Sequence, residues 1–237
     1  MTVRAALTAL GLIGACAVPA CGAGRDGVRM ATFSVATASY GHGALGPGHE
    51  WARLNIQGDA GSLSFQDERA LVFEDIAPRL IDLDGDGDNE AMVVESSQTQ
   101  GSRLAIWTGE GRLAATAFIG NRHRWLAPAG AADLDGDGRI EIAYVETPHL
   151  GRVLKIARLE GDRLVRVAEA RGLTNHRFGE PVIEGRIAIC AGRPTILTAN
   201  ADWTRIVGTT LAKGKLAGRD LAAYMGPASF DRITGCD

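Results

Sequence analysis

The sequence has little that is typical of membrane-spanning proteins or of nucleic-acid-binding proteins. After its N-terminal segment it has no uninterrupted apolar run of about 18 residues, the length that a membrane-spanning helix requires. It also lacks an excess of one charge, because 25 basic and 28 acidic residues leave a formal net charge of −3. The basic residues are scattered, and the densest group, residues 122–124, is too short to form a nucleic-acid footprint. Nucleic acid is therefore not an expected partner.

The sequence contains no common catalytic motif. The metalloprotease pattern HExxH, the hydrolase pattern GxSxG and the P-loop are all absent. His123 and His176 are each followed by Arg and an aromatic residue, which favours a packing role at equivalent repeat positions. The glycine-rich segment 38–51, with His42 and His49, is the best candidate for a surface site, although an irregular connection is the more ordinary interpretation. These observations favour a protein that is not an enzyme.

Long helical periodicity is also missing, and the hydrophobic pattern repeats every second residue instead. Stretches such as EAMVVES, SRLAIWTG and RLAATAFIG are typical of short strands joined by glycine-containing turns. The large aromatic residues Trp107, Trp125 and Phe178 are expected in the core that these strands enclose. The sequence therefore predicts an all-β fold.

A sequence repeat with a period near 50 organises these strands. DLDGDGDNEAMVVES at residue 82 recurs as DLDGDGRIEIAYVET at residue 133, and HRWLAP at 123 is echoed by HRFGEP at 176. GRIEIAYVE at 138 is echoed by GRIAICAG at 185, in a third copy that has lost the acidic segment. Three or four short strands per repeat are typical of propeller blades. We predict one β-propeller-like repeat domain over residues 24–237, with about four blades near residues 30–75, 76–120, 121–174 and 175–237.

The N-terminal segment has the pattern of a secretory signal peptide over residues 1–23. Arg4 precedes an apolar stretch at residues 5–13, and small residues follow, which is the three-part pattern of such signals. A lipoprotein signal is the alternative, because the sequence IGAC before and at Cys16 resembles a lipobox whose cysteine is lipidated. Both interpretations predict an exported protein, periplasmic or extracellular, and only the second gives it a membrane contact, through an anchor at Cys16.

Export changes how the four cysteines are interpreted. Cys16 and Cys21 leave with the signal or serve as an anchor, so Cys190 and Cys236 remain as a pair in an oxidising compartment. We expect a disulfide between these two, which would hold the last residues of the chain in place. Two unrelated thiols, one buried and one terminal, are the alternative.

Two acidic loops carry the strongest chemical signal: residues 82–90 (the first acidic loop) and residues 133–141 (the second acidic loop). Each has carboxylates at positions 1, 3, 5 and 9 and glycine at positions 4 and 6, where the backbone must curl until oxygen atoms meet. Position 7 is expected to contribute its backbone carbonyl. Ligands that are all oxygen favour Ca²⁺ over zinc or copper, and Mg²⁺ is disfavoured because it retains water. The loops are not EF-hands, since position 12 lies inside a strand as Val93 or Tyr144.

With this repeat context, the two DxDGDGxxE loops resemble the calcium loops of the FG-GAP/VCBS repeat family, the integrin-α-like β-propellers. The resemblance covers roughly residues 70–220, and the Phe-Gly and Gly-Ala-Pro elements of the family survive only as fragments at 178–179 and 127–128. Family propellers have about seven blades, so this shorter chain is compatible with a small ring, an open arc or an oligomer. The resemblance implies two calcium sites: Asp82, Asp84, Asp86, Asp88 (through its carbonyl) and Glu90 in one, and Asp133, Asp135, Asp137, Arg139 (through its carbonyl) and Glu141 in the other.

These features predict an exported calcium-binding repeat protein that acts as a non-enzymatic binding or scaffold module of the cell envelope. Its ligand is expected to be a protein or a glycan, and calcium is expected to tie strands and turns together. An envelope hydrolase or lyase that uses a propeller face and a bound metal is the alternative, which an open metal position beside His42 or His149 would favour. A third hypothesis is a lipoprotein, anchored at Cys16, that assists envelope assembly.

Overall fold

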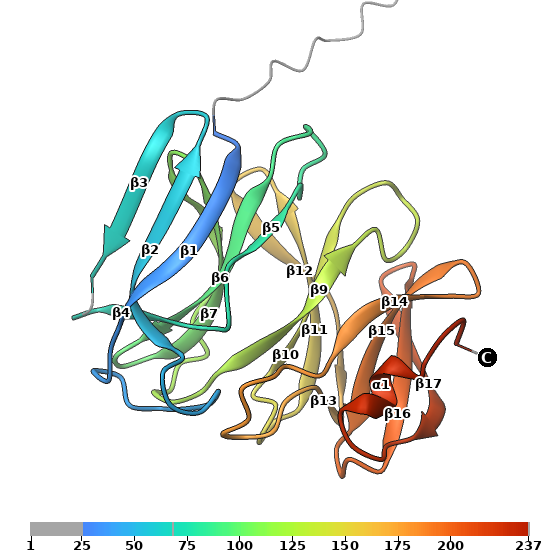
Figure 1. The fold of residues 1–237 in the computed structure, drawn as a ribbon. Coiled ribbons are helices and arrows are strands. Elements are labelled where there is room, and N and C mark those ends of the chain that lie inside the picture. Colours follow the sequence, from blue (N-terminus) through green and yellow to red (C-terminus); the bar gives the residue numbers. More distant parts are fainter. Residues whose placement is uncertain (1–25, 68, 237) are drawn as a thin grey trace, which may run out of the picture.

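A computed structural model describes residues 26–67 and 69–236 of the chain, and the predicted signal peptide, including Cys16, lies outside them. The described residues form three antiparallel sheets that follow one another along the chain. Figure 1 shows these sheets side by side in an open arc, with the first and the third at its two ends. The predicted all-β, β-propeller-like fold is therefore confirmed, as an open arrangement. Within the described ranges, no helix has the length and apolar character needed to cross a membrane.

The first sheet contains eight strands and covers the ranges predicted as the first two blades. β4 makes the junction, because Phe73 pairs with Trp51 of β2 and also with Glu95 of β6. β5 pairs with the first residues of β6, and Arg79 lies opposite Met92. Figure 1 shows that the sheet is curled. The strands are β1 (Val28–Ala36), β2 (Glu50–Gly58), β3 (Gly61–Gln66), β4 (Leu71–Glu74), β5 (Arg79–Ile81), β6 (Glu90–Ser97), β7 (Gly101–Thr108) and β8 (Gly111–Ala115).

The second sheet has the order β12-β11-β10-β9, and the third has the order β13-β15-β16-β17 with β14 also paired to β15. A short helix, α1 (Ala228–Asp231), follows the last strand. The strands of the second sheet are β9 (Leu126–Ala132), β10 (Glu141–Glu146), β11 (Val153–Glu160) and β12 (Arg163–Arg171). Those of the third are β13 (Leu173–Thr174), β14 (Arg186–Cys190), β15 (Arg193–Asn200), β16 (Arg205–Ala212) and β17 (Lys215–Ala223).

The second sheet holds the arc together because both of its faces are apolar. Successive residues of a strand face opposite sides of the sheet, and β10 is buried from Glu141 to Val145. Ile142 shares a buried cluster with Met92 of the first sheet, whereas Val145 shares one with Ile196 of the third. A strand that is covered on both faces reads as a continuous apolar run, which explains the segment IAYV at residues 142–145.

Two of the three aromatic residues expected in the core lie there. Trp107 and Trp125 are 3% and 1% exposed, and the indole N–H of Trp125 donates to the carbonyl oxygen of Glu74 at 2.8 Å. The prediction for Phe178 is wrong, because its side chain is 59% exposed. It lies in the connection between β13 and β14, where no strand pattern directs a side chain into the core.

The acidic loops occupy corresponding places in the first and second sheets. The first acidic loop connects β5 to β6, and the second connects β9 to β10. The corresponding connection in the third sheet, from β14 to β15, is a tight turn between the paired residues Cys190 and Arg193. A turn this short has no room for the acidic segment, which accounts for its loss from the third copy.

Two of the sequence echoes are not structurally equivalent. The echo of GRIEIAYVE by GRIAICAG aligns Arg139 with Arg186. Arg139 lies in the second acidic loop, whereas Arg186 is the first residue of β14. Similarly, His123 precedes β9, whereas His176 follows β13. The expectation of equivalent repeat positions for the two histidines is therefore wrong, because the third sheet builds its first edge from two short strands.

The predicted disulfide is present between Cys190 and Cys236, whose Cα atoms are 4.7 Å apart. It links the end of β14 to the segment that follows α1, and both cysteines are buried. Phe230 of α1 and Tyr224 belong to the same buried cluster as the two cysteines. The bridge and this cluster together hold the C-terminal segment on the third sheet.

Candidate metal centre

The first acidic loop curls around the carboxylate of Asp82. Its two oxygens accept hydrogen bonds from the backbone N–H groups of Gly85 and Gly87 at 2.8 and 3.1 Å. Both glycines have positive φ, 81° and 97°, a conformation that side-chain-bearing residues rarely adopt, which explains glycine at positions 4 and 6. One carboxylate oxygen each of Asp82, Asp84 and Asp86 lies within 4.8 Å of the other two. The loop thus brings together three of the predicted ligands.

The second acidic loop repeats this geometry. The carboxylate of Asp133 accepts hydrogen bonds from the N–H groups of Gly136 and Gly138 at 2.7 and 3.0 Å, and these glycines have φ of 81° and 86°. Here the oxygens that lie within 4.8 Å of one another belong to Asp133, Asp135 and Glu141. The same sequence pattern therefore produces the same backbone turn in two sheets, with a different third member in each carboxylate group.

A glutamate closes each loop from the first position of the following strand. Glu90 accepts the backbone N–H of Leu83 at 2.8 Å, and Glu141 accepts that of Leu134 at 2.8 Å. Both leucines are buried, at 3% and 4% exposed, so the second position of each loop is an apolar anchor. The glutamate fixes the start of the loop to the strand, while the leucine fixes it to the core.

The first acidic loop gathers several carboxylates around one buried glutamate. Glu90 is 4% exposed, and this burial raises the pKa of its carboxyl to about 7, against the lowering effect of the Leu83 N–H. The charges of Asp84, Asp86 and Asp82 raise that pKa further. Burial, and then the neighbouring carboxylates, also raise the pKa of Asp84. A cation that entered the loop would remove this repulsion.

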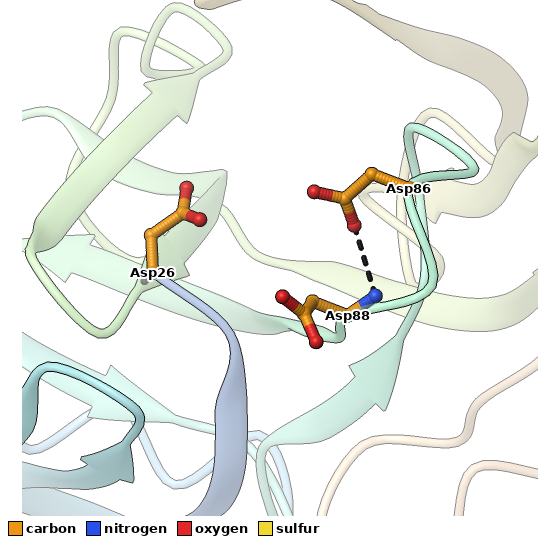
Figure 2. Close-up of side chains that lie close together, drawn as sticks. All are labelled: Asp26, Asp86 and Asp88. Atoms are coloured by element: carbon orange, nitrogen blue, oxygen red, sulfur yellow. Dashed lines mark hydrogen bonds between the residues drawn. The ribbon is translucent and has the colours of Figure 1, made fainter. Parts of the chain in front are cut away.

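Asp88 does not face the group formed by Asp82, Asp84 and Asp86. Its backbone N–H donates to Asp86 at 2.9 Å, and its carboxylate turns toward Asp26, as Figure 2 shows. Asp26, Asp86 and Asp88 form a second carboxylate group within 4.8 Å. A side chain that points away agrees with the interpretation that position 7 needs only its carbonyl, which stays a prediction. Asp26 could not be identified from the sequence, because it precedes β1 and belongs to no motif.

The second acidic loop differs because two arginines reach its carboxylates. Exposed Arg139 donates to Asp137 at 2.8 Å, and this contact lowers the pKa of the Asp137 carboxyl. Arg158 of β11 lies opposite Glu141, and its Nε donates to that glutamate at 2.5 Å. The role of Arg158 could not be predicted from the sequence, because only the register of β10 and β11 places it opposite Glu141. No ion pair reaches the carboxylates of the first acidic loop within residues 26–67 and 69–236.

A comparison with protein families decides what these loops resemble. Residues 82–144 match the FG-GAP-like repeat. The matched segment contains both acidic loops and the strands from β6 to the start of β10, so the resemblance noted in the sequence is confirmed over this part of the chain. Searches of the curated proteins and of the solved structures found no match.

The connection between β1 and β2 forms a second candidate site, away from the loops of the FG-GAP-like repeat. A cavity of about 500 Å³ lies there, lined by His42, Glu50 and several glycines. His42 Nδ1 lies 2.6 Å from a carboxylate oxygen of Glu74, which is 1% exposed. The N–H of Gly179 donates to Ala44 at 2.8 Å, so the connections of the first and third sheets meet beside this cavity.

Two more histidines form a hydrogen-bonded chain near it. His176 Nε2 lies 2.7 Å from the carbonyl oxygen of Glu180, which can only accept, so this nitrogen carries a proton. In the neutral ring Nδ1 then accepts, and His149 Nε2 donates to it at 2.9 Å. The ring of Phe178 packs edge-on against both His42 and His149, with centroids 5.7 and 5.3 Å apart. The described histidines form no group of three metal ligands.

The buried histidine chain predicts acid sensitivity. Burial, and then the charges of His176, His42 and Arg152, lower the pKa of His149 to about 4. In the unfolded chain this histidine binds a proton below about pH 6.5, whereas in the folded protein it does so only below about pH 4. The free energy of unfolding therefore decreases as the pH falls from about 6.5 to about 4. We expect His149→Gln to lose less stability than the wild type between pH 7 and pH 4.5, by on the order of 1–3 kcal/mol. Urea unfolding at both pH values measures this difference, and equal losses in the two proteins would contradict it.

Proposed function

We propose that this chain is an exported binding module whose acidic loops bind calcium and thereby hold its sheets in place. The FG-GAP-like repeat suggests a β-propeller-type binding module. The observation that carries the calcium proposal is the convergence of Asp82, Asp84 and Asp86, whose oxygens lie within 4.8 Å of one another. Three carboxylates at this distance repel one another, and a cation among them would relieve that repulsion.

Two other buried acids in the region of the first sheet, Glu95 and Asp75, support this proposal by contrast. Glu95 pairs with Arg103 at 2.7 Å, and Asp75 pairs with Arg79 at 2.5 Å. Both carboxylates are fully buried, and each has its counter-charge in place. Glu90 is nearly as buried, yet its partner is a neutral backbone N–H group, and no ion pair of the described residues includes it. A cation in the first acidic loop would supply the counter-charge that Glu90 lacks.

The donor atoms indicate which cation this is. Every candidate ligand side chain in the two groups is a carboxylate, and neither group contains a histidine or a cysteine. Hard, all-oxygen sites suit Ca²⁺, which accepts irregular arrangements of six to eight ligands, whereas Mg²⁺ demands a near-octahedral one. Asp82, Asp84, Asp86 and Glu90 would hold the ion in the first loop, with the carbonyl of Asp88.

Export and an oxidising compartment are supported by the Cys190–Cys236 disulfide. We place the mature protein in the periplasm or outside the cell, either free or anchored through Cys16. We propose a non-enzymatic role in which a protein or glycan partner docks at the cavity beside His42, where connections of the first and third sheets meet. Exposed Phe178 and Leu150 lie in connections between strands and offer apolar contact area to such a partner.

Isothermal titration with Ca²⁺ tests the calcium proposal. We expect binding with a dissociation constant on the order of 10⁻⁴ to 10⁻³ M, as in other extracellular modules. Asp84→Asn should remove binding at the first acidic loop, because it deletes one ligand charge while sparing the Asp82 hydrogen bonds that shape the turn. The matched control is Asp162→Asn, at an exposed acid in the turn between β11 and β12, which should leave binding unchanged. No heat of binding in the wild type at millimolar Ca²⁺ would refute the proposal.

A further inference from the structure

Arg158 lies where a cation of the second acidic loop would compete with it. Its side chain is 7% exposed, and it reaches three carboxylates of that loop. Nε donates to Glu141 at 2.5 Å, and Nη2 contacts Glu141 as well. Nη2 also lies 3.3 Å from an oxygen of Asp135 and 3.2 Å from an oxygen of Asp137. Two of these acids, Asp135 and Glu141, belong to the group whose oxygens converge.

The corresponding strand of the first sheet has no such residue. Ala91 of β6 lies opposite Trp107 of β7, and one further step along both strands places Thr108 opposite Glu90. Thr108 is buried, and its hydroxyl accepts the N–H of Glu110 at 3.2 Å. In place of a guanidinium, the first acidic loop gains another carboxylate, from Asp26.

The two loops therefore have the same backbone conformation but a different ratio of negative to positive side chains. The first acidic loop and its neighbour Asp26 contribute six carboxylates, and the described residues add no arginine or lysine to them. The second acidic loop has four carboxylates, and the guanidinium groups of Arg139 and Arg158 contact them. Each positive charge within hydrogen-bonding distance weakens the attraction of the same oxygens for a metal ion.

We propose that Arg158 is the resident counter-cation of the second acidic loop. It holds this loop folded without calcium and competes with calcium for Asp135 and Glu141, so the two loops bind the ion with unequal affinity. This inference rests on the proposed calcium-binding function. The folded conformation of the first acidic loop depends on calcium. The second acidic loop keeps its conformation without calcium and binds the ion more weakly.

Calcium titration in an Asp84→Ala background tests the inference, because that change silences the first acidic loop. Adding Arg158→Gln removes the charge at similar side-chain length, and the affinity of the second acidic loop for Ca²⁺ should then rise at least about tenfold. The matched control is Arg103→Gln, which alters an arginine that pairs with buried Glu95 across β6 and β7. It should leave the calcium affinity unchanged.

A second variant keeps the test decisive if the glutamine variant does not fold. Arg158→Lys retains the charge but not the planar fork that contacts three carboxylates, so its calcium affinity should lie between those of the wild type and the glutamine variant. A glutamine variant that folds only with calcium present would also support the inference. Unchanged affinity in the folded variants would overturn it while leaving the proposed function intact. Absence of calcium binding by the first acidic loop of the wild type would instead refute the proposed function.

Discussion

Calcium should raise the melting temperature of the mature protein by about 5–10 °C. At a free concentration 100 times the dissociation constant, a ligand that binds only the folded state adds about 2.7 kcal/mol to its stability. A domain of this size gains about 2–4 °C for each kcal/mol. With a dissociation constant on the order of 10⁻⁴ M, about 10 mM Ca²⁺ is enough. Differential scanning calorimetry with Ca²⁺ and with EGTA measures the shift.

The double variant Asp84→Ala with Asp135→Ala should abolish that rise. Each change removes one converging carboxylate from a loop, and neither residue supplies the hydrogen bonds by which Asp82 and Asp133 form the turns. In EGTA the melting temperature of the single variant Asp84→Ala should equal or exceed that of the wild type, because carboxylate repulsion in the first acidic loop is relieved. If EGTA leaves the wild-type melting curve unchanged, calcium has no structural role.

Removal of the disulfide should have an effect of similar size. The bridge joins residues that are 46 apart in sequence, and a cross-link of this length stabilises a fold by about 2–4 kcal/mol. We expect Cys190→Ser with Cys236→Ser to lower the melting temperature by about 5–15 °C. Calorimetry under the same conditions as for the wild type gives this value.

Without the disulfide, local unfolding should begin at the C-terminal segment. Once the bridge is gone, the polar contacts of this segment with the third sheet are mainly those of two arginines and one backbone pair. Arg186 contacts Asp231 and the carbonyl of Phe230, Arg219 contacts the carbonyl of Cys236, and Ala191 donates to Gly235 at 3.2 Å. Hydrogen exchange should accelerate first around α1 and only later in β10. The calcium-induced rise should persist, since the acidic loops belong to the other two sheets. Uniform acceleration across all three sheets would show that the bridge does not act locally.

The features that could be predicted from the sequence are those that local pattern determines. Alternating apolar residues predicted strands such as EAMVVES and SRLAIWTG, which are β6 and β7 in the structure. The spacing of glycines and acids predicted the turns around Asp82 and Asp133, because these form from hydrogen bonds within five residues. The two cysteines left after the N-terminal segment predicted the bridge, because they formed the remaining pair in a chain that we expect to be exported.

The features that could not be predicted depend on contacts between distant segments. Arg158 reaches Glu141 through the register of β10 and β11, and the register follows from the length of a connection that the sequence does not determine. Asp26 joins Asp88 because Val28 hydrogen-bonds Asn89, across about 60 residues of chain. The junction of two predicted blades in one sheet rests on a few pairs made by β4, too short a strand for its partners to be predicted.

Anomalous diffraction from crystals grown with CaCl₂ tests the central claim most directly. The account predicts an anomalous peak among the carboxylates of Asp82, Asp84 and Asp86, with a weaker peak or none in the second acidic loop beside Arg158. The same crystals washed in EGTA should lose the peak in the first loop. A first acidic loop that holds only water at millimolar calcium, with its three carboxylates still converged, would contradict the account.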